Sequence, residues 1–171
     1  KISPTAAACF TFLNRFVYQD SHCRMAQIAY DAGQYGQLSV HPGIHNSTQV
    51  KRILVDDPDK TDVYGYDAQD FLNTKDYLNV ILYRLNHEPQ MACPDAQWIL
   101  DEYRDSVEML RYGCDIALYR LGCLQGYDAP GYQAMMRSRR DDILREHSRI
   151  WRLRNRECDK GAARFFHQFD L

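Results

Sequence analysis

The sequence predicts an all-α protein, an antiparallel bundle or array of about six helices. Apolar residues return every three or four positions through most of the chain, and no segment keeps the alternation of period two that indicates a strand. The 171 residues are 45% hydrophobic and 26% charged, which is typical of an ordinary globular domain. Because the sequence has no internal repeat and no low-complexity linker, residues 1–171 are predicted to form a single helical domain.

Three shorter helices are predicted in the first third of the chain. Ser3 and Pro4 make a good helix start, because serine caps free backbone N–H groups and proline suits the first turn. A second helix is expected from about Ser21 to Gly33, and a third begins after Ser47 or Thr48. Their expected apolar faces are Cys9, Phe12, Leu13, Phe16 and Val17 in the first, Met25, Ile28, Ala29 and Ala32 in the second, and Val50, Ile53 and Leu54 in the third.

Three longer helices are predicted in the rest of the chain. The first begins near Asp67 and stops near Pro89, the second runs from about Pro94 to Gly122, and the third follows a turn that ends at Gly131. The second has an apolar stripe that continues over several turns, so it is expected at the centre of the bundle. The expected apolar faces are Phe71, Leu72, Leu78, Ile81, Leu82 and Leu85; Trp98, Ile99, Tyr103, Val107, Leu110, Cys114, Ala117, Leu118 and Leu121; and Met135, Ile143, Leu144, Ile150, Trp151 and Leu153.

The charge balance argues against nucleic acid and membranes as partners. With 21 Lys+Arg and 23 Asp+Glu the net charge is −2, so the molecule has no long-range positive field. The basic run from Arg137 to Arg156 is interleaved with acidic residues one helical turn away, such as Asp142 and Glu146, which indicates a surface helix with local ion pairs. No apolar run approaches the roughly 20 residues that span a bilayer.

No metal or cofactor site is predicted. His41 and His45 lie in a Pro-Gly loop, and a metal site would need His22, Asp31 or another residue as a further ligand. The six cysteines show no Cys-x-x-Cys pair, so most of them are expected to be small buried hydrophobic residues, with disulfides as the alternative in a secreted protein. They are Cys9, Cys23, Cys93, Cys114, Cys123 and Cys158.

No catalytic residue is predicted either. The chain contains no Gly-x-Ser-x-Gly, P-loop, dinucleotide-binding or His-Glu-x-x-His motif. The adjacent acids Asp56-Asp57 and Asp141-Asp142 point in different directions on a turn or helix and do not converge as glycosidase carboxylates must. The Asn-Ser-Thr tripeptide at Asn46 is a glycosylation signal only in a eukaryotic secretory pathway.

The order of segments resembles the helical C-terminal region of bacterial β-N-acetylhexosaminidase-like proteins of glycoside hydrolase family 20. The resemblance covers most of the chain. It departs from the family where "ECDKGAA" stands in place of a Pro-Gly-Gly that commonly follows the Arg-Asn-Arg end. The similar pieces are the helix end at Phe16 to Asp20, the Asp-x-Gly piece at Asp31 to Tyr35 (one residue closer here), the piece at Leu110 to Cys114 and the Trp-x-Leu-x-Asn end at Trp151 to Arg156, written "WRLRNR".

The resemblance implies an accessory domain of a hydrolase. In that family the helical region follows a (β/α)8 barrel, and the barrel carries the Asp-Glu pair of a substrate-assisted mechanism. No residue of 1–171 is expected to take either role, because eight strands and about 200 residues are needed for a barrel. The sequence begins at Lys1 without an initiator methionine, which fits the expectation of a C-terminal piece of a larger chain.

Two other functions remain open from the sequence. The chain could be an independent helical module that binds a protein partner or forms a homo-oligomer, since 12 Tyr is a high number and tyrosine is frequent in interfaces. It could also be a small helical enzyme that uses His22, His41, His45 or cysteine residues. The expectation carried forward is a non-catalytic helical domain whose partner is the upstream catalytic barrel, with a terminal helix that buries Trp151 and uses arginines to bind carboxylates of neighbouring helices.

Overall fold

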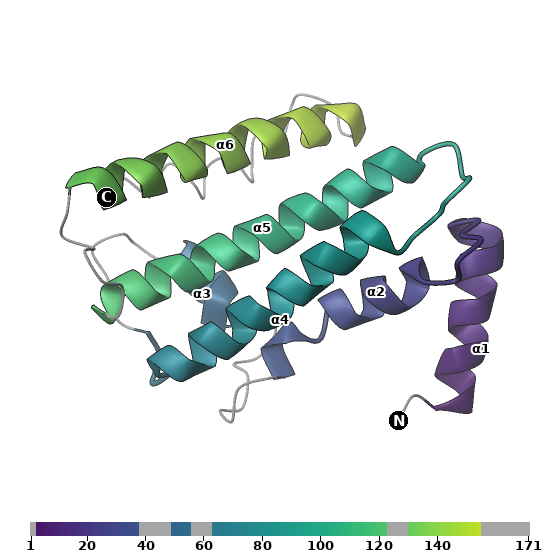
Figure 1. The fold of residues 1–171 in the computed structure, drawn as a ribbon, viewed down its shortest axis with the longest axis horizontal. Helices are drawn as coiled ribbons and strands as arrows, with labels where there is room; N and C mark the ends of the chain where they lie inside the picture. Colours follow the sequence, from purple (N-terminus) through teal and green to yellow (C-terminus); the bar gives the residue numbers. More distant parts are fainter. Residues whose placement is uncertain (1–2, 38–48, 56–62, 123–129, 155–171) are drawn as a thin grey trace.

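The computed structural model confirms the all-α prediction and describes residues 3–37, 49–55, 63–122 and 130–154 (Figure 1). Within these ranges there is no strand, and Asp20 and Met91 form an isolated bridge. None of the described helices is both long and apolar enough to cross a bilayer. The helices are α1 (Pro4–Phe12), α2 (Met25–Ala32), α3 (Gln49–Val55), α4 (Ala68–His87), α5 (Ala96–Arg120) and α6 (Pro130–Arg154), with a π-helical turn η1 (Leu13–Val17) and a 3-10 turn η2 (Tyr35–Gln37).

Helix α5 is the central element, and α3, α4 and α6 all pack against it (Figure 1). Helix α4 runs antiparallel to α5, because its early residue Lys75 bonds to the late Asp115 and its late Asn86 bonds to the early Arg104. Helix α2 packs on α4, while α1 stands across the end of the array. The long helix predicted at the centre of the bundle is therefore confirmed.

Local capping explains where two of the predicted helices begin. Asp67 accepts a hydrogen bond from the backbone N–H of Asp70, and the Asp70 carboxylate accepts one from the N–H of Asp67. This reciprocal arrangement satisfies N–H groups that a helix start leaves free. The Ser3 hydroxyl does the same for the N–H of Ala6, at 3.2 Å, directly before Pro4.

Helices α2, α3, α4, α5 and α6 all contribute side chains to the core, and α3 crosses α5 closely within it. Gly113 allows this close approach: a Cβ built there would lie 2.7 Å from Val50 Cγ1 and 3.0 Å from Leu54 Cγ. Real Cβ atoms do not come so near another side chain, so the crossing requires glycine or a shift of α3. The largest fully buried side chains are Tyr112, Phe71, Met25, Ile28, Ile53, Leu78, Ile81, Leu85, Ile116, Leu118 and Met136.

Four residues predicted for the apolar faces of the three long helices are exposed. Trp98 is 44% exposed because the enclosed part of α5 lies between Asp105 and Leu118, beyond its first two turns. On α6 the buried stripe passes through Met136, and the neighbouring Met135 faces solvent. The exposed residues are Trp98, Leu72, Met135 and Leu153.

Some sequence-based expectations lie outside the described residues. They are His41 and His45 with the Asn46 sequon, the Asp56-Asp57 pair, and the end of the last helix near Gly161. Residues 123–129, which contain most of the expected turn before α6, also lie outside this set.

Candidate functional site

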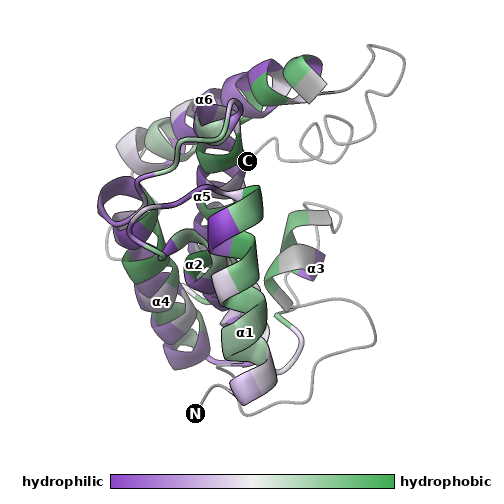
Figure 2. Ribbon diagram, turned by 90° about the vertical axis from the view of Figure 1, so that its right-hand side faces the viewer, coloured by the Kyte–Doolittle hydropathy of each residue, from purple (hydrophilic) through white to green (hydrophobic). Residues whose placement is uncertain are grey.

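Helix α1 is apolar and yet none of its residues is buried. The segment from Ile2 to Asn14 has no charged side chain, and α1 is more apolar in sequence than α2, α4, α5 or α6. Phe12 is 58% exposed and Phe16 in η1 is 59% exposed. We call the exposed side chains of Ala8, Cys9, Phe12, Phe16 and Val17 the α1 apolar surface. The ribbon of α1 is mostly in the hydrophobic colours (Figure 2).

This exposure corrects the sequence-based expectation for the first helix. Cys9, Phe12, Phe16 and Val17 recur at helical spacing and were predicted to face the core, but all four are exposed. The helix was predicted correctly, and its apolar face was not, because periodicity shows that a face is apolar without showing what covers it. Exposed apolar side chains that form a contiguous group are typical of interaction sites.

Polar contacts at its C-terminal end attach α1 to the rest of the molecule. The buried Asn14 accepts a hydrogen bond from the Ala26 N–H at its Oδ1, at 2.8 Å, and its carbonyl accepts one from the Asp20 N–H. The only ring contact the structure gives between α1 and α2 is Phe10 with Tyr30, with centroids 5.4 Å apart. The helix is thus fixed in position while the α1 apolar surface stays accessible.

The buried carboxylate of Asp20 organises the turn between η1 and α2. It accepts hydrogen bonds from the backbone N–H groups of Arg24 (2.7 Å), Met25 (2.8 Å), Gln90 (2.7 Å) and His22 (3.1 Å). Burial acts to raise the pKa of Asp20, but these N–H donors outweigh it and hold the pKa below its usual value. This cap explains why α2 begins at Met25, four residues after the predicted start.

A charged seam joins α5 to α6. Asp101 accepts from Arg149 at 2.6 Å, Asp105 pairs with His147 Nδ1 at 2.8 Å, and Glu108 accepts from Arg139 at 3.2 Å. Residues later in α5 pair with residues earlier in α6, so the two helices are antiparallel. The stacked rings of Tyr119 and Tyr132, 6.2 Å apart, continue the same register toward the end of α5.

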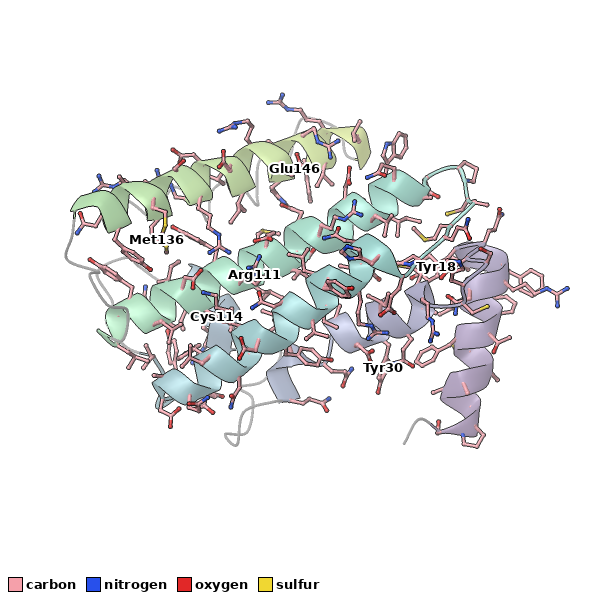
Figure 3. All side chains as sticks on the ribbon, in the orientation of Figure 1. Tyr18, Tyr30, Arg111, Cys114, Met136 and Glu146 are labelled. Atoms are coloured by element: carbon pink, nitrogen blue, oxygen red, sulfur yellow. The ribbon has the colours of Figure 1, made fainter. Side chains whose placement is uncertain are left out.

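The seam continues into the core at Asp115. This carboxylate is 4% exposed and accepts hydrogen bonds from Lys75 of α4, at 2.5 Å, and from Arg139 of α6. Between the charges, Met136 points from α6 toward α5, and Ile143 and Ile150 are buried with it (Figure 3). Fully burying such a side chain contributes about 1.5–3 kcal/mol, whereas the solvent-exposed ion pairs of the seam, such as Arg149 with Glu146, contribute about 0–1 kcal/mol each.

Two clefts lie along the seam on either side of Asp105. The larger has a volume of about 280 Å³, which is near the lower end for small-molecule sites, and the smaller has about 180 Å³. The larger is lined by Asp101, Arg104, Asp105, Glu108, Arg139, Asp142, Ile143 and Glu146, and the smaller by Glu102, Asp105, Ser106, Met109, His147, Ile150 and Trp151.

Two carboxylates of the larger cleft, Asp101 and Glu146, are ion-paired with a neighbouring arginine. Hydrogen bonds from Arg149 lower the pKa of Glu146. Burial acts to raise the pKa of Asp101, but hydrogen bonds from Arg149 and Gln97 outweigh it and the pKa is lowered. A general acid at neutral pH needs the opposite, a carboxyl whose pKa is raised. The geometry therefore favours a structural role for these two groups.

Two residues weighed as metal ligands have other partners. His22 Nδ1 lies 2.8 Å from the Glu88 carbonyl, and Asp31 is ion-paired with Arg84 at 2.6 Å. Across the described ranges no three His, Cys, Asp or Glu side chains are placed to hold a metal ion.

The cysteines divide into two groups. Cys93 and Cys114 are buried free thiols, whereas Cys9 and Cys23 are exposed, so the expectation that most of the cysteines are buried holds for two of the four that the structure describes. Burial raises the pKa of the Cys114 thiol to about 12, so it stays protonated and behaves as a small hydrophobic residue. Cys123 and Cys158 lie outside the described residues.

The basic run of α6 is paired as its sequence suggests. Arg145 bonds to Asp142 at 3.0 Å and Arg149 to Glu146 at 2.5 Å, both one turn away along the helix. Sequence reasoning expected arginines to bind carboxylates of neighbouring helices without identifying them, and Asp101 is one such partner. Trp151 is half-buried beside His147, with ring centroids 6.0 Å apart.

No protein-family model matches this sequence, and neither the curated proteins nor the solved structures include a match to it. The resemblance to family 20 hydrolases stays a prediction.

Proposed function

We propose that this chain is a non-catalytic helical accessory domain that docks through the α1 apolar surface onto another folded unit, the catalytic barrel of a β-N-acetylhexosaminidase-like glycoside hydrolase. The observation that supports docking is a helix without charge or buried residues, held at one end by Asn14 and Asp20. The barrel as partner rests on the resemblance of the sequence to family 20 proteins.

The α1 apolar surface has the properties of a docking element. Phe12 and Phe16 are large side chains on a helix that is already formed, so binding orders little additional chain. Each has more than half of its surface exposed, and burying that part would contribute about 1–2 kcal/mol per ring. The five side chains of the surface are uncharged, and Arg15 lies beside them with its guanidinium over the Phe16 ring, so the surface suits an apolar groove between helices of a partner.

The charged seam supports a non-catalytic role. Asp101, Glu108 and Glu146 each bond to an arginine, and Asp105 bonds to His147. Ion pairs of this kind favour charged carboxylates. Those between Asp101 and Arg149 and between Asp105 and His147 hold α6 against α5.

Two measurements test this function. The coding sequence directly before Lys1 is predicted to encode barrel strands with an Asp-Glu pair, and any other upstream sequence would contradict the barrel as partner. The purified 171-residue chain is predicted to leave a chromogenic N-acetylglucosaminide intact under conditions in which a family 20 enzyme cleaves it. Turnover that copurifies with the chain would contradict the non-catalytic role.

The second candidate function is an independent helical module that docks the same surface onto a different protein. The absence of charge on α1 supports this second function as well as the first, since an uncharged face is compatible with many apolar grooves. A fluorescent hydrophobic dye tests the surface that both functions share, since the purified chain should bind it at α1, and the upstream coding sequence separates the two functions. The variant Phe12→Ser/Phe16→Ser should abolish the dye signal, whereas the control Val80→Ser/Tyr83→Ser on α4, with equally exposed residues, should leave it unchanged.

A further inference from the structure

The contact between α5 and α6 combines two complementary patterns. Helix α5 presents an acidic stripe at spacings of four, three and seven residues, which place its members on one side of the helix: Asp101, Asp105, Glu108 and Asp115. Helix α6 brings apolar side chains at intervals of seven residues with cations between them: Met136, Arg139, Ile143, His147, Arg149 and Ile150. The acidic stripe therefore fits a basic amphipathic helix in antiparallel orientation.

Helix α6 makes extended contact with one element. Among the described helices it packs over several turns on α5, and no comparable contact joins it to another helix (Figure 1). Met136 and Ile143 of α6 belong to the same buried core as the residues of α3 and α4. Removing α6 would uncover the α5 side chains beneath it, among them Tyr112, whose ring lies under Arg139, so an α6 from another chain would be needed to bury them again.

The acidic stripe retains cations when α6 is absent. Lys75 of α4 still bonds to Asp115, Arg104 to Asp101 and Arg111 to Glu108, at 2.5, 3.3 and 2.5 Å. Asp105 is the member of the stripe whose ion pair comes from α6 alone. An open state in which α6 has left α5 is therefore electrostatically tolerable, because most of the uncovered carboxylates keep a partner.

We propose that the acidic stripe of α5 is a docking surface that the α6 helix of a second copy of this chain can occupy, so that two chains exchange α6 reciprocally. A second copy offers the same residues in the same register, and every seam contact of the monomer is rebuilt twice around a two-fold axis. The resident α6 has the advantage of a high effective concentration, so the exchanged dimer forms at high protein concentration. This surface is separate from α1 and does not depend on the proposed barrel.

A labelled peptide of residues 130–154, added to the full chain, tests whether the stripe accepts α6 from another molecule. Fluorescence anisotropy at low salt should show saturable binding, and raising NaCl to about 0.5 M should weaken the affinity by about tenfold because salt screens the ion pairs. A control peptide with Arg139→Glu and Arg149→Glu should lose binding. No saturable binding of the unchanged peptide, or equal binding of the control, would overturn the docking surface.

The occupant is tested by light scattering on the unlabelled full chain. A dimer fraction that rises with protein concentration and falls when excess peptide competes supports reciprocal exchange. A chain that binds the peptide but stays monomeric at every concentration would overturn the second copy as occupant. Arg145→Ala, which removes an exposed pair within α6, is the matched variant that should leave both measurements unchanged.

Discussion

Phe12 and Phe16 pack against each other with ring centroids 5.0 Å apart, although each ring is more than half exposed. An aromatic pair of this kind contributes about 0.5–1.5 kcal/mol when it is buried, and little while solvent surrounds it. Phe12 lies in a segment that has no charged residue between Lys1 and Arg15, and the Arg15 guanidinium lies over the Phe16 ring, 5.1 Å from its centroid. This combination distinguishes α1 from the other described helices.

The double variant Phe12→Ser/Phe16→Ser is expected to leave the folded chain almost unchanged. Because neither ring is part of the buried core, the free energy of unfolding should fall by less than about 1 kcal/mol in urea denaturation. Phe71→Ser, which places a hydroxyl in the core, should lower it by about 3 kcal/mol or more. A comparable loss in both variants would show that α1 is part of the core.

Gly113→Ala is expected to destabilise the protein by about 1–3 kcal/mol, because the added methyl group must displace Val50 and Leu54 of α3. Thermal or urea unfolding followed by circular dichroism measures the change. A Cβ added at Gly131 in α6 would meet no atom within 4 Å. Gly131→Ala should therefore be neutral or stabilising by up to about 1 kcal/mol. If the two substitutions had the same effect, the close crossing of α3 over α5 would be wrong.

Asp20→Ala is expected to lower the free energy of unfolding by about 2–3 kcal/mol at pH 7, because four backbone N–H groups lose their shared acceptor. The folded-state pKa of Asp20 lies below the ordinary 3.8. Its contribution to stability is therefore complete above about pH 4–5 and declines as the pH falls through the folded-state pKa.

Urea unfolding at several pH values measures this dependence. The difference between the wild-type chain and Asp20→Ala should shrink as the pH falls below about 4, because the protonated carboxyl no longer attracts the N–H groups. Asp142→Ala, at an exposed carboxylate, should change stability by less than about 0.5 kcal/mol. A difference for Asp20→Ala that stays constant down to pH 2 would contradict the capping role.

Asp115→Asn is expected to destabilise the protein by about 2–3 kcal/mol, because Lys75 and Arg139 lose the carboxylate that joins α4, α5 and α6. A double-mutant cycle with Arg139→Gln measures the coupling between the two side chains. The coupling should be favourable by about 1 kcal/mol or more, since the carboxylate is buried. Independent, additive effects of the two substitutions would show that the pair does not hold α6 in place.

The helices that are buried on several sides were the most predictable from sequence. Asp67 and Asp70 indicated the start of α4, and the spacing of Phe71, Leu78, Ile81 and Leu85 identified its buried face. The short helix with Val50, Ile53 and Leu54 was confirmed for the same reason. In these segments local capping and apolar periodicity agree with the tertiary packing.

The features that depend on contacts between distant residues could not be predicted. The start of α2 depends on Asp20, whose carboxylate also binds the N–H of Gln90, 70 residues away. The pairing of Arg149 with Asp101 depends on the register of α5 against α6, while the pair with Glu146 follows from spacing alone. The exposure of Phe12 was unpredictable because a sequence pattern does not identify what covers an apolar face.

The central claim, that α1 is a docking helix, is tested most directly by the reactivity of two exposed thiols. Cys9 lies within the α1 apolar surface, and Cys23 lies outside it, beside α2. Alkylation followed by peptide mass spectrometry should show that both react readily in the isolated chain. In a polypeptide that carries the proposed upstream barrel, Cys9 should react at least about tenfold more slowly while Cys23 reacts as before. Equal reactivity of Cys9 in the two forms would contradict docking through α1.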